Sequence, residues 1–339
     1  MTRLTDEMEN TYIDERIFKL LPKLAALAPY KPSQRERGVK NEGLAGWKAL
    51  AAREARLLMQ AYPDDRPESE REYGTALRQI TALKKGLLMA AKSKLKDPQT
   101  YHQVCTIITN FGNALSFLFS PYKERQNTRY RETVKVRAMK ENRIALDLTP
   151  WLEKAHQVLL RVASGATSAD IEWRDVSCAV ALATGRRMAE VHLSAELSGQ
   201  GDYKIAFKGQ LKGKHRKVEG HSLRSHSFEI PTLLRADLVV CGLDWLEHHG
   251  KRFERTEDPE RVNRRWSKVL NERAKDWEII PEMTYHKFRG AYLKACLVND
   301  AVDPFDYLDY ARSILGDNDE ATIKAYQRFE IAPGSKTRI

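Results

Sequence analysis

Residues 181–191 read Ala-Leu-Ala-Thr-Gly-Arg-Arg-Met-Ala-Glu-Val, an apolar segment followed by a glycine and two consecutive arginines. Apolar residues precede it at helical spacing, and Gly185 is a natural helix stop, so we predict that a helix ends here. His286-Lys-Phe-Arg289 and then Tyr326 follow further along the chain. Arginine grips phosphate oxygens with a planar fork that stays charged, and a tyrosine can attack phosphorus. Together these residues predict a phosphoryl-transfer site that needs no metal.

The composition favours two domains and a polyanionic partner. The chain has 339 residues, too long for one ordinary domain and comfortable for two. Hydrophobic residues make up 42% and charged residues 30%, and the mean hydropathy is -0.56, so the cores are expected to lie beneath a very polar surface. The net charge is +11, from 57 Lys and Arg against 46 Asp and Glu, which favours nucleic acid as the partner. A basic protein without such a partner is the alternative that charge alone leaves open.

The cysteines and the first residues indicate the cytoplasm. The four cysteines are far apart and form no CxxC pair, so neither a zinc site nor a disulfide framework is expected. The opening residues, MTRLTDEMEN, are charged and unlike a signal peptide. No run approaches the roughly 18 apolar residues that a membrane span needs.

The first part of the chain is predicted to be helical. Apolar positions recur at helical spacing from Ile17 to Leu24, from Leu44 to Leu57 and from Arg71 to about Lys94. The run Tyr101–Phe119 is apolar on most sides, which favours the central helix of a bundle. We therefore expect a helical N-terminal DNA-binding domain over residues 1–120.

A very basic segment with few apolar residues, Pro121–Arg143, comes next. It predicts a linker over residues 121–148 that lies along a duplex and neutralises its phosphates. A solvated surface without a ligand is the alternative.

Residues 149–339 predict a second domain in which helices surround a small sheet. Apolar periodicity predicts helices near residues 151–162, 171–182, 239–249, 260–277, 284–299, 304–315 and 319–329. Alternation predicts strands at residues 191–197, 203–207 and 227–231, with a polar, basic turn at Gly209–Arg224. The expected fold class is mainly α with a small β-sheet.

Three motifs resemble the tyrosine recombinase superfamily, which shares its catalytic fold with type IB topoisomerases. In that superfamily they read Thr-Gly-x-Arg-x-x-Glu, His-x-x-Arg, and Leu-Gly-His/Trp with a tyrosine nine positions after the His or Trp. Here they are matched by Thr184, Gly185, Arg187 and Glu190, by His286 and Arg289, and by Leu315, Gly316, Asp317 and Tyr326. The resemblance covers about residues 150–330.

The resemblance implies that Arg187 and Arg289 clamp the phosphate, whereas Arg186 is out of register. Glu190 would orient a positive neighbour. A lysine on a hairpin between the first two motifs would protonate the leaving 5′-oxygen. The candidates are Lys208, Lys212 and Lys214. Lys212 is preferred because of its distance after Arg187, and Lys208 is the second choice.

The resemblance also implies roles for a histidine and a tyrosine. His286 would donate a hydrogen bond to a non-bridging oxygen or carry the tyrosine proton. Tyr326 would be the nucleophile, whereas Tyr285 and Tyr292 flank the second motif and are set aside. The other histidines are interpreted as structural: His215, His221, His226, His248 and His249.

One position departs from the superfamily. Asp317 stands where most members have His or Trp, and an ionised carboxylate repels a phosphate. Asp317 would bridge Arg187 or His286, or carry a proton, and Asp319 is the other candidate for this position.

The long helical N-terminal part, the hairpin FKGQLKGK and the helix YHKFRGAYLKA together look like the protelomerases, or hairpin telomere resolvases. The resemblance implies a homodimer that clamps a palindromic DNA duplex and cuts both strands through 3′-phosphotyrosyl links. Each end would be resealed as a hairpin, with neither metal nor ATP and no other cofactor. Such a protein would be cytoplasmic in a bacterial cell and associated with the nucleoid.

Two other interpretations remain open from the motifs. A site-specific integrase shares the chemistry but exchanges strands between two duplexes. A DNA-binding protein that lost its activity, with Asp317 as the lesion, belongs to another class. Only Gln327 to Ile339 follow the tyrosine, so a further C-terminal module, if the natural protein has one, would lie beyond this chain.

Overall fold

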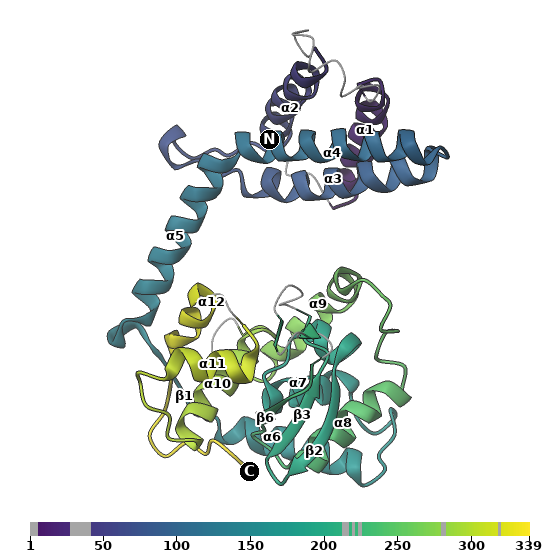
Figure 1. The fold of residues 1–339 in the computed structure, drawn as a ribbon. Helices are drawn as coiled ribbons and strands as arrows, with labels where there is room; N and C mark the ends of the chain where they lie inside the picture. The colour runs from purple at the N-terminus through teal and green to yellow at the C-terminus, as the bar shows by residue number, and fades with distance from the viewer. Residues whose placement is uncertain are drawn as a thin grey trace. The chain divides into compact units, whose positions relative to one another are not determined.

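The computed structural model describes residues 6–27, 42–211, 217–218, 221–222, 226–278, 283–317 and 320–339. The chain divides into two compact units, Met1–Arg131 and Glu132–Ile339, and the division falls inside the predicted linker (Figure 1). The expectation of a mainly α fold with a small β-sheet is confirmed. The candidates Lys212, Lys214 and Asp319 lie outside the described residues.

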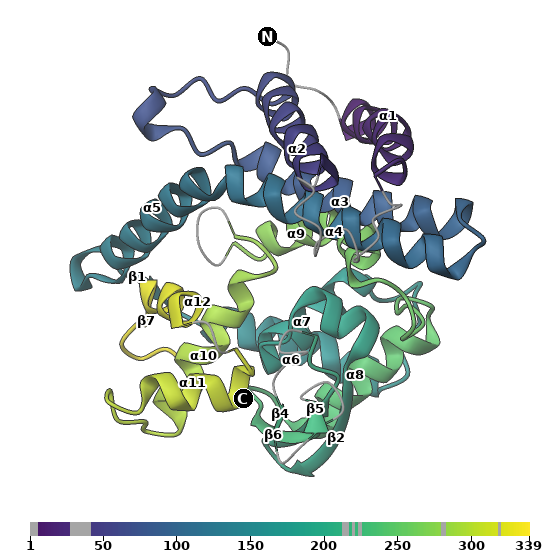
Figure 2. The same ribbon diagram turned by 45° about the horizontal axis from the view of Figure 1, so that its top comes forward.

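The N-terminal unit is a helical bundle. Its helices are α1 (Asp6–Ala25), α2 (Glu42–Ala61), α3 (Gly74–Lys94) and α4 (Pro98–Leu118). Helices α3 and α4 lie side by side, and α1 and α2 pack across them (Figures 1 and 2). The Asp97 side chain caps α4 by accepting the Thr100 N–H at 2.7 Å, and Pro98 occupies the first turn, where its missing N–H costs no hydrogen bond. Helices α3 and α4 each contact the other three helices, so the two together form the centre of the bundle.

Helix α5 (Ser120–Ala138) connects the two units and is mostly exposed, because only Val134 among its side chains is buried. The Arg125 guanidinium fixes its first turns by donating to the carbonyls of Glu68 and Arg71 at 2.7 and 3.1 Å. The short helix η3 (Lys140–Asn142) and strand β1 (Ile144–Leu146) follow.

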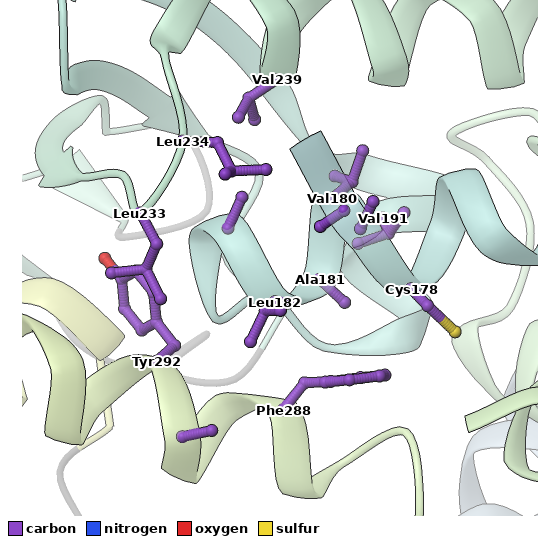
Figure 3. Close-up of a cluster of buried hydrophobic side chains, with 14 of the residues drawn as sticks. Cys178, Val180, Ala181, Leu182, Val191, Leu233, Leu234, Val239, Phe288 and Tyr292 are labelled. Atoms are coloured by element: carbon purple, nitrogen blue, oxygen red, sulfur yellow. The ribbon is translucent and has the colours of Figure 1, made fainter. Parts of the chain in front are cut away.

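The C-terminal unit is built around α7 (Trp173–Thr184), whose residues Asp175–Thr184 are all buried. It contacts α6 (Thr149–Ala163), α8 (Ala236–His248), α9 (Pro259–Lys275) and α10 (Lys287–Asn299). Figure 3 shows side chains of α7, α8 and α10 converging on one core. Each fully buried Leu, Val or Phe contributes about 1.5–3 kcal/mol. This packing holds the end of α7, where the first motif begins, in one place.

The sheets of the C-terminal unit are small. Strands β2 (Glu196–Gly201), β3 (Lys204–Lys208) and β6 (Phe228–Pro231) form an antiparallel sheet in the order β2-β3-β6. Strands β4 (Lys217–Val218) and β5 (His221–Ser222) pair in the turn between β3 and β6. Strand β1 pairs in parallel with β7 (Phe329–Ile331), which no sequence pattern predicted. Helices α11 (Tyr307–Leu315) and α12 (Glu320–Ala325) complete the unit.

Two predicted elements were wrong in part. Residues 190–194 form a π-helix, η4, rather than the start of a strand, and the Ala195 N–H donates to the Glu190 carbonyl at 2.8 Å. All five side chains of η4 are buried, so the alternating pattern did not mark a buried and an exposed face. The last predicted helix ends at Ala325, because Tyr326–Arg328 form a 3-10 turn, η5, and Phe329 enters β7. No described helix combines the length and apolar character needed to cross a membrane.

Candidate active site

The first motif begins at the end of α7, where Gly185 reverses the chain. Its φ is +65°, a left-handed conformation that favours glycine. A Cβ atom at this position would lie 2.2 Å from the Tyr292 ring, so a side chain is also excluded by space. The turn sends the two following arginines in different directions.

Arg186 is part of the core. Its guanidinium donates to the carbonyls of Thr184 and Ile314 at 3.1 and 2.6 Å, and it stacks 4.4 Å above the Phe207 ring. The side chain is 2% exposed, and burial lowers the pKa of Arg186 to about 10. Arg186 therefore joins α7 to the end of α11 and to β3.

Arg187 is held between two carboxylates. Its Nη1 donates to Glu190 at 2.9 Å, and its Nη2 donates to Asp317. Glu190 also accepts the backbone N–H of Arg187 at 3.0 Å, which fixes the backbone and the side chain together. Burial opposes ionisation of Glu190, but Arg187, with Arg186 and Arg289, lowers the pKa of its carboxyl below the ordinary value. The expectation that Glu190 orients a positive neighbour fits this geometry.

Arg289, on the first turn of α10, is 1% exposed and joins three parts of the unit. It donates to the carbonyls of Gly185 and Leu315 at 2.6 and 2.7 Å and to the Asp317 carboxylate at 2.8 Å. Burial disfavours its charge, but Asp317 outweighs this effect and raises the pKa of Arg289. The guanidinium is thus charged and fixed in orientation.

Asp317 bridges both arginines, one oxygen to each. The sequence suggested Arg187 or His286 as the partner of Asp317. Asp317 contacts Arg187, and its second guanidinium partner is Arg289. The Nε atoms of Arg187 and Arg289 are buried without a hydrogen-bond acceptor among the described residues. Arg187, Arg289, Glu190 and Asp317 form a cluster that we call the arginine side of the site.

Tyr326 and His286 form the other half, the tyrosine side. The Tyr326 hydroxyl lies 3.3 Å from His286 Nε2, and the rings are 6.0 Å apart. Gly290 makes room for the Tyr326 and Phe329 rings, because a Cβ atom there would lie 3.1 Å from the former and 2.6 Å from the latter. Burial raises the pKa of the Tyr326 phenol, whereas Arg289 and Arg187 oppose the rise. The Tyr326 phenol therefore lies close enough to both guanidinium groups for their positive charge to favour its ionised form.

Of the three candidate lysines, Lys208 lies within the described residues. Lys208 is at the end of β3, and its ammonium pairs with Glu196 across the sheet at 3.6 Å. Lys212 and Lys214 lie outside the described residues. The two tyrosines that the sequence set aside are buried with partners: Tyr285 bonds to Ser177, and Tyr292 donates to the Pro231 carbonyl at 2.8 Å.

Sequence reasoning missed a buried polar network beside the site. Ser177 Oγ lies 2.7 Å from His192 Nε2 and 2.8 Å from the Tyr285 hydroxyl, and His192 Nδ1 lies 2.7 Å from the Lys251 carbonyl. Burial lowers the pKa of His192 to about 4, so the imidazole is neutral at pH 7. The network connects η4, which carries Glu190, to the residue before His286. No spacing in the sequence points to it.

Gln210 was also missed. It follows β3, is 0% exposed, and lies between Arg186 and the end of α11. An amide in a polar, basic turn gives no sequence signal of burial.

Comparison with known proteins places the chain in a family. The family model of the telomere resolvase ResT/TelK catalytic domain matches residues 142–329, more than half of the chain. The chain belongs to this family. The matched telomere resolvase domain begins just before β1 and contains every candidate site residue that the sequence indicated.

Two protelomerases of phages are similar to this chain. That of Escherichia phage N15 is 26% identical over 233 residues, which are 63% of this chain and 36% of the relative. That of Yersinia phage PY54 is 23% identical over 207 residues, 57% of this chain and 33% of the relative. The aligned part thus spans about a third of the length of the relatives.

Solved protelomerase structures share the fold of this chain. A protelomerase TelA variant covalently complexed with substrate DNA matches with a TM-score of 0.62 and 17% identity, covering 95% of this chain and 94% of that one. Protelomerase TelK complexed with substrate DNA matches with a TM-score of 0.52 and 18% identity, covering 98% of this chain and 71% of that one.

Proposed function

We propose that the chain is a protelomerase that cuts both strands of a palindromic DNA duplex and reseals each end as a closed hairpin. The observation that carries this proposal is the convergence of Arg187, Arg289, His286 and Tyr326 within a telomere resolvase domain. The similar solved proteins include one described as covalently complexed with substrate DNA, which supports a covalent protein–DNA intermediate here.

In the proposed reaction the Tyr326 oxygen attacks the phosphorus in line with the leaving 5′-oxygen. A P–O bond to tyrosine forms, the P–O5′ bond breaks, and the product is a 3′-phosphotyrosyl link with a free 5′-hydroxyl. The phenol proton passes to His286, whose Nε2 lies 3.3 Å away. Lys212 supplies the proton to the 5′-oxygen. Reversal with the 5′-hydroxyl of the opposite strand closes the hairpin and conserves the bond energy, so ATP is not consumed.

The arginine side stabilises the charge that develops on the non-bridging oxygens. The Nε–H groups of Arg187 and Arg289 are buried and have no acceptor among the described residues, so phosphate can accept from them only if the surrounding side chains move when DNA binds. Glu190 keeps Arg187 in place while the phosphate binds. The Asp317 carboxylate lies between the two guanidinium groups. A phosphate that binds there must either share these groups with Asp317 or displace its carboxylate.

The N-terminal unit and α5 supply further DNA contacts in this proposal. Helix α5 exposes basic side chains along its length and has a single buried residue. Such a helix neutralises phosphates and releases counterions, which makes affinity depend steeply on salt. We propose that the domains at residues 1–120 and 149–339, joined by the linker 121–148, clamp one duplex. Two copies of the chain occupy the palindrome as a homodimer.

The test uses a library of end-labelled inverted-repeat duplexes. Incubation with the chain should yield protein–DNA adducts resistant to detergent and, after completion, strands that snap back under denaturing electrophoresis. Exchange between two labelled duplexes instead would favour an integrase. Binding without any adduct would favour a DNA-binding protein that lacks the chemistry. Cleavage should persist in EDTA, and loss of activity there would contradict the proposed chemistry.

A further inference from the structure

His286 is exposed, although the proposed reaction needs its imidazole at a fixed place beside the Tyr326 hydroxyl. Its Nε2 lies 3.3 Å from that oxygen, and a proton passes only within hydrogen-bond reach. An exposed side chain keeps such a distance where its backbone is held by buried neighbours and their hydrogen bonds. The residue before it, Tyr285, is 2% exposed and is such a neighbour.

Tyr285 is anchored at both ends. Its backbone N–H donates to Asn271 Oδ1 on α9 at 2.9 Å. Its hydroxyl lies 2.8 Å from Ser177 Oγ and 3.0 Å from the Ser177 carbonyl oxygen, both on α7. Its ring packs edge-on against Phe288, with the ring centroids 5.8 Å apart. Since α7 and α9 both contribute buried residues to the core, Tyr285 ties the backbone before His286 to that core.

The direction of each hydrogen bond in the network around Ser177 follows from its far end. The Lys251 carbonyl can only accept, so His192 Nδ1, which lies 2.7 Å away, carries the proton. Nε2 of the neutral ring is then the acceptor, and the Ser177 hydroxyl donates to it at 2.7 Å. The Ser177 oxygen is left to accept from the Tyr285 hydroxyl. Every donor from Tyr285 to His192 is satisfied, which holds the phenol of Tyr285 in one orientation.

We propose that Tyr285 is a positioning residue that keeps the His286 imidazole within reach of the Tyr326 proton. Phenylalanine at this position removes one hydroxyl and keeps the ring, and the Ser177 hydroxyl retains its acceptor on His192. The expected effect is a small displacement of the backbone before His286, with no hole in the core. A displacement on the order of 1 Å can slow a reaction about 10²-fold. This inference rests on the proposed function, in which His286 accepts the proton of the nucleophile.

A double-mutant cycle separates positioning from structural support, with an inverted-repeat duplex that forms an adduct with the unmodified chain as the substrate. Tyr285→Phe should slow single-turnover cleavage by about 10- to 100-fold, since a misplaced base loses part of the roughly 10²–10⁴-fold that it contributes. In a His286→Ala background no imidazole remains to be positioned, so the same substitution should change the rate by less than about threefold. In an Arg187→Ala background the effect of Tyr285→Phe should stay as large as in the unmodified chain.

The matched control is Tyr292→Phe, which removes another buried hydroxyl, one on α10 that donates to the Pro231 carbonyl. Its cleavage rate should stay within about threefold of that of the unmodified chain. With protein in saturating excess, the rate constant of a single turnover does not depend on the fraction of protein that is folded. Asn271→Ala removes the other anchor of Tyr285 and should show the same dependence on His286, so it takes the place of Tyr285→Phe if that variant does not fold.

An equal loss with and without the His286 imidazole would overturn the inference and leave Tyr285 a structural residue. An unchanged rate in Tyr285→Phe alone would overturn it as well. So would an unchanged rate in His286→Ala, because there would then be no base to position. Failure of the unmodified chain to form an adduct would instead refute the proposed function, and the role of Tyr285 with it.

Discussion

The two halves of the site are built in opposite ways. On the arginine side, two carboxylates hold the Arg187 guanidinium, and two carbonyls and a carboxylate hold that of Arg289 at 2.6–2.8 Å. On the tyrosine side, the Tyr326 hydroxyl lies 3.3 Å from Nε2 of His286, an exposed histidine, and Tyr326 belongs to a one-turn 3-10 segment.

The difference indicates which groups of the proposed site are already in their final positions before DNA binds. Donors that are already fixed cost no reorganisation when charge develops on the phosphate. In the proposed reaction the Tyr326 oxygen, by contrast, forms one bond to phosphorus on cleavage and loses it on resealing, so its position must adjust during the cycle. We therefore expect substitutions on the arginine side to affect catalysis through charge, and those on the tyrosine side through the covalent step itself.

The largest effect is expected from Tyr326→Phe, which removes the attacking oxygen. Covalent adduct should fall by at least about 10⁴-fold, while DNA affinity changes by less than about threefold, because the other phosphate contacts dominate binding. Adduct is measured by denaturing electrophoresis and affinity by fluorescence anisotropy. Tyr307→Phe is the control, since that buried hydroxyl donates to the Ile323 carbonyl instead. Adduct persisting in Tyr326→Phe would remove the tyrosine side from the mechanism.

Arg289→Ala and Arg187→Ala should each slow cleavage by about 10²–10³-fold, the cost of removing one fixed donor to a developing oxyanion. Binding should weaken by less than about tenfold. Single-turnover cleavage and anisotropy on the same duplex measure both quantities. A loss of binding as large as the loss of cleavage would mean that the arginines hold DNA rather than the transition state.

The pH dependence of stability tests the network that joins the two sides. The native His192 imidazole binds its proton only below about pH 4, whereas an unfolded histidine does so below about 6.5. Acid between these values therefore favours the unfolded state, and the contribution present above pH 6.5 is lost as pH falls toward 4. The loss is about 3 kcal/mol. Urea unfolding at several pH values should show a shallower slope for His192→Gln; an identical slope would refute the buried neutral imidazole.

Asp317→Asn adds one unit of positive charge to the arginine side. In a Tyr326→Phe background, where no cleavage occurs, affinity for duplex should rise about tenfold at low salt and less at high salt. Weaker binding would indicate instead that the carboxylate is needed to orient the two guanidinium groups toward phosphate.

The smallest effect is expected from Lys208→Ala. Its ammonium already pairs with Glu196, so cleavage should change by less than about threefold, against a loss of about 10²-fold or more for Lys212→Ala. The reverse order would make Lys208 the acid.

Much of the site could be anticipated because its residues lie in three short motifs with fixed spacing. Arg187, Arg289 and Tyr326 meet in space as that pattern implies. The π-helix at Glu190–Ser194 could not be anticipated, since a fully buried segment and a half-buried strand can share the same apolar alternation. Gln210 could not either, because its burial depends on Leu315 and Gly316, more than 100 positions away.

Strand β7 begins three residues after Tyr326 and is hydrogen-bonded to β1, which follows α5 after a few residues. Arg143 and Glu330 add an ion pair across the same junction at 3.9 Å. The segment that carries Tyr326 is therefore joined through β7 to the strand that enters this unit. Phe329 of β7 is also buried in the core and packs against α10, so the position of the Tyr326 phenol depends on the β1–β7 pair and on the helical core together.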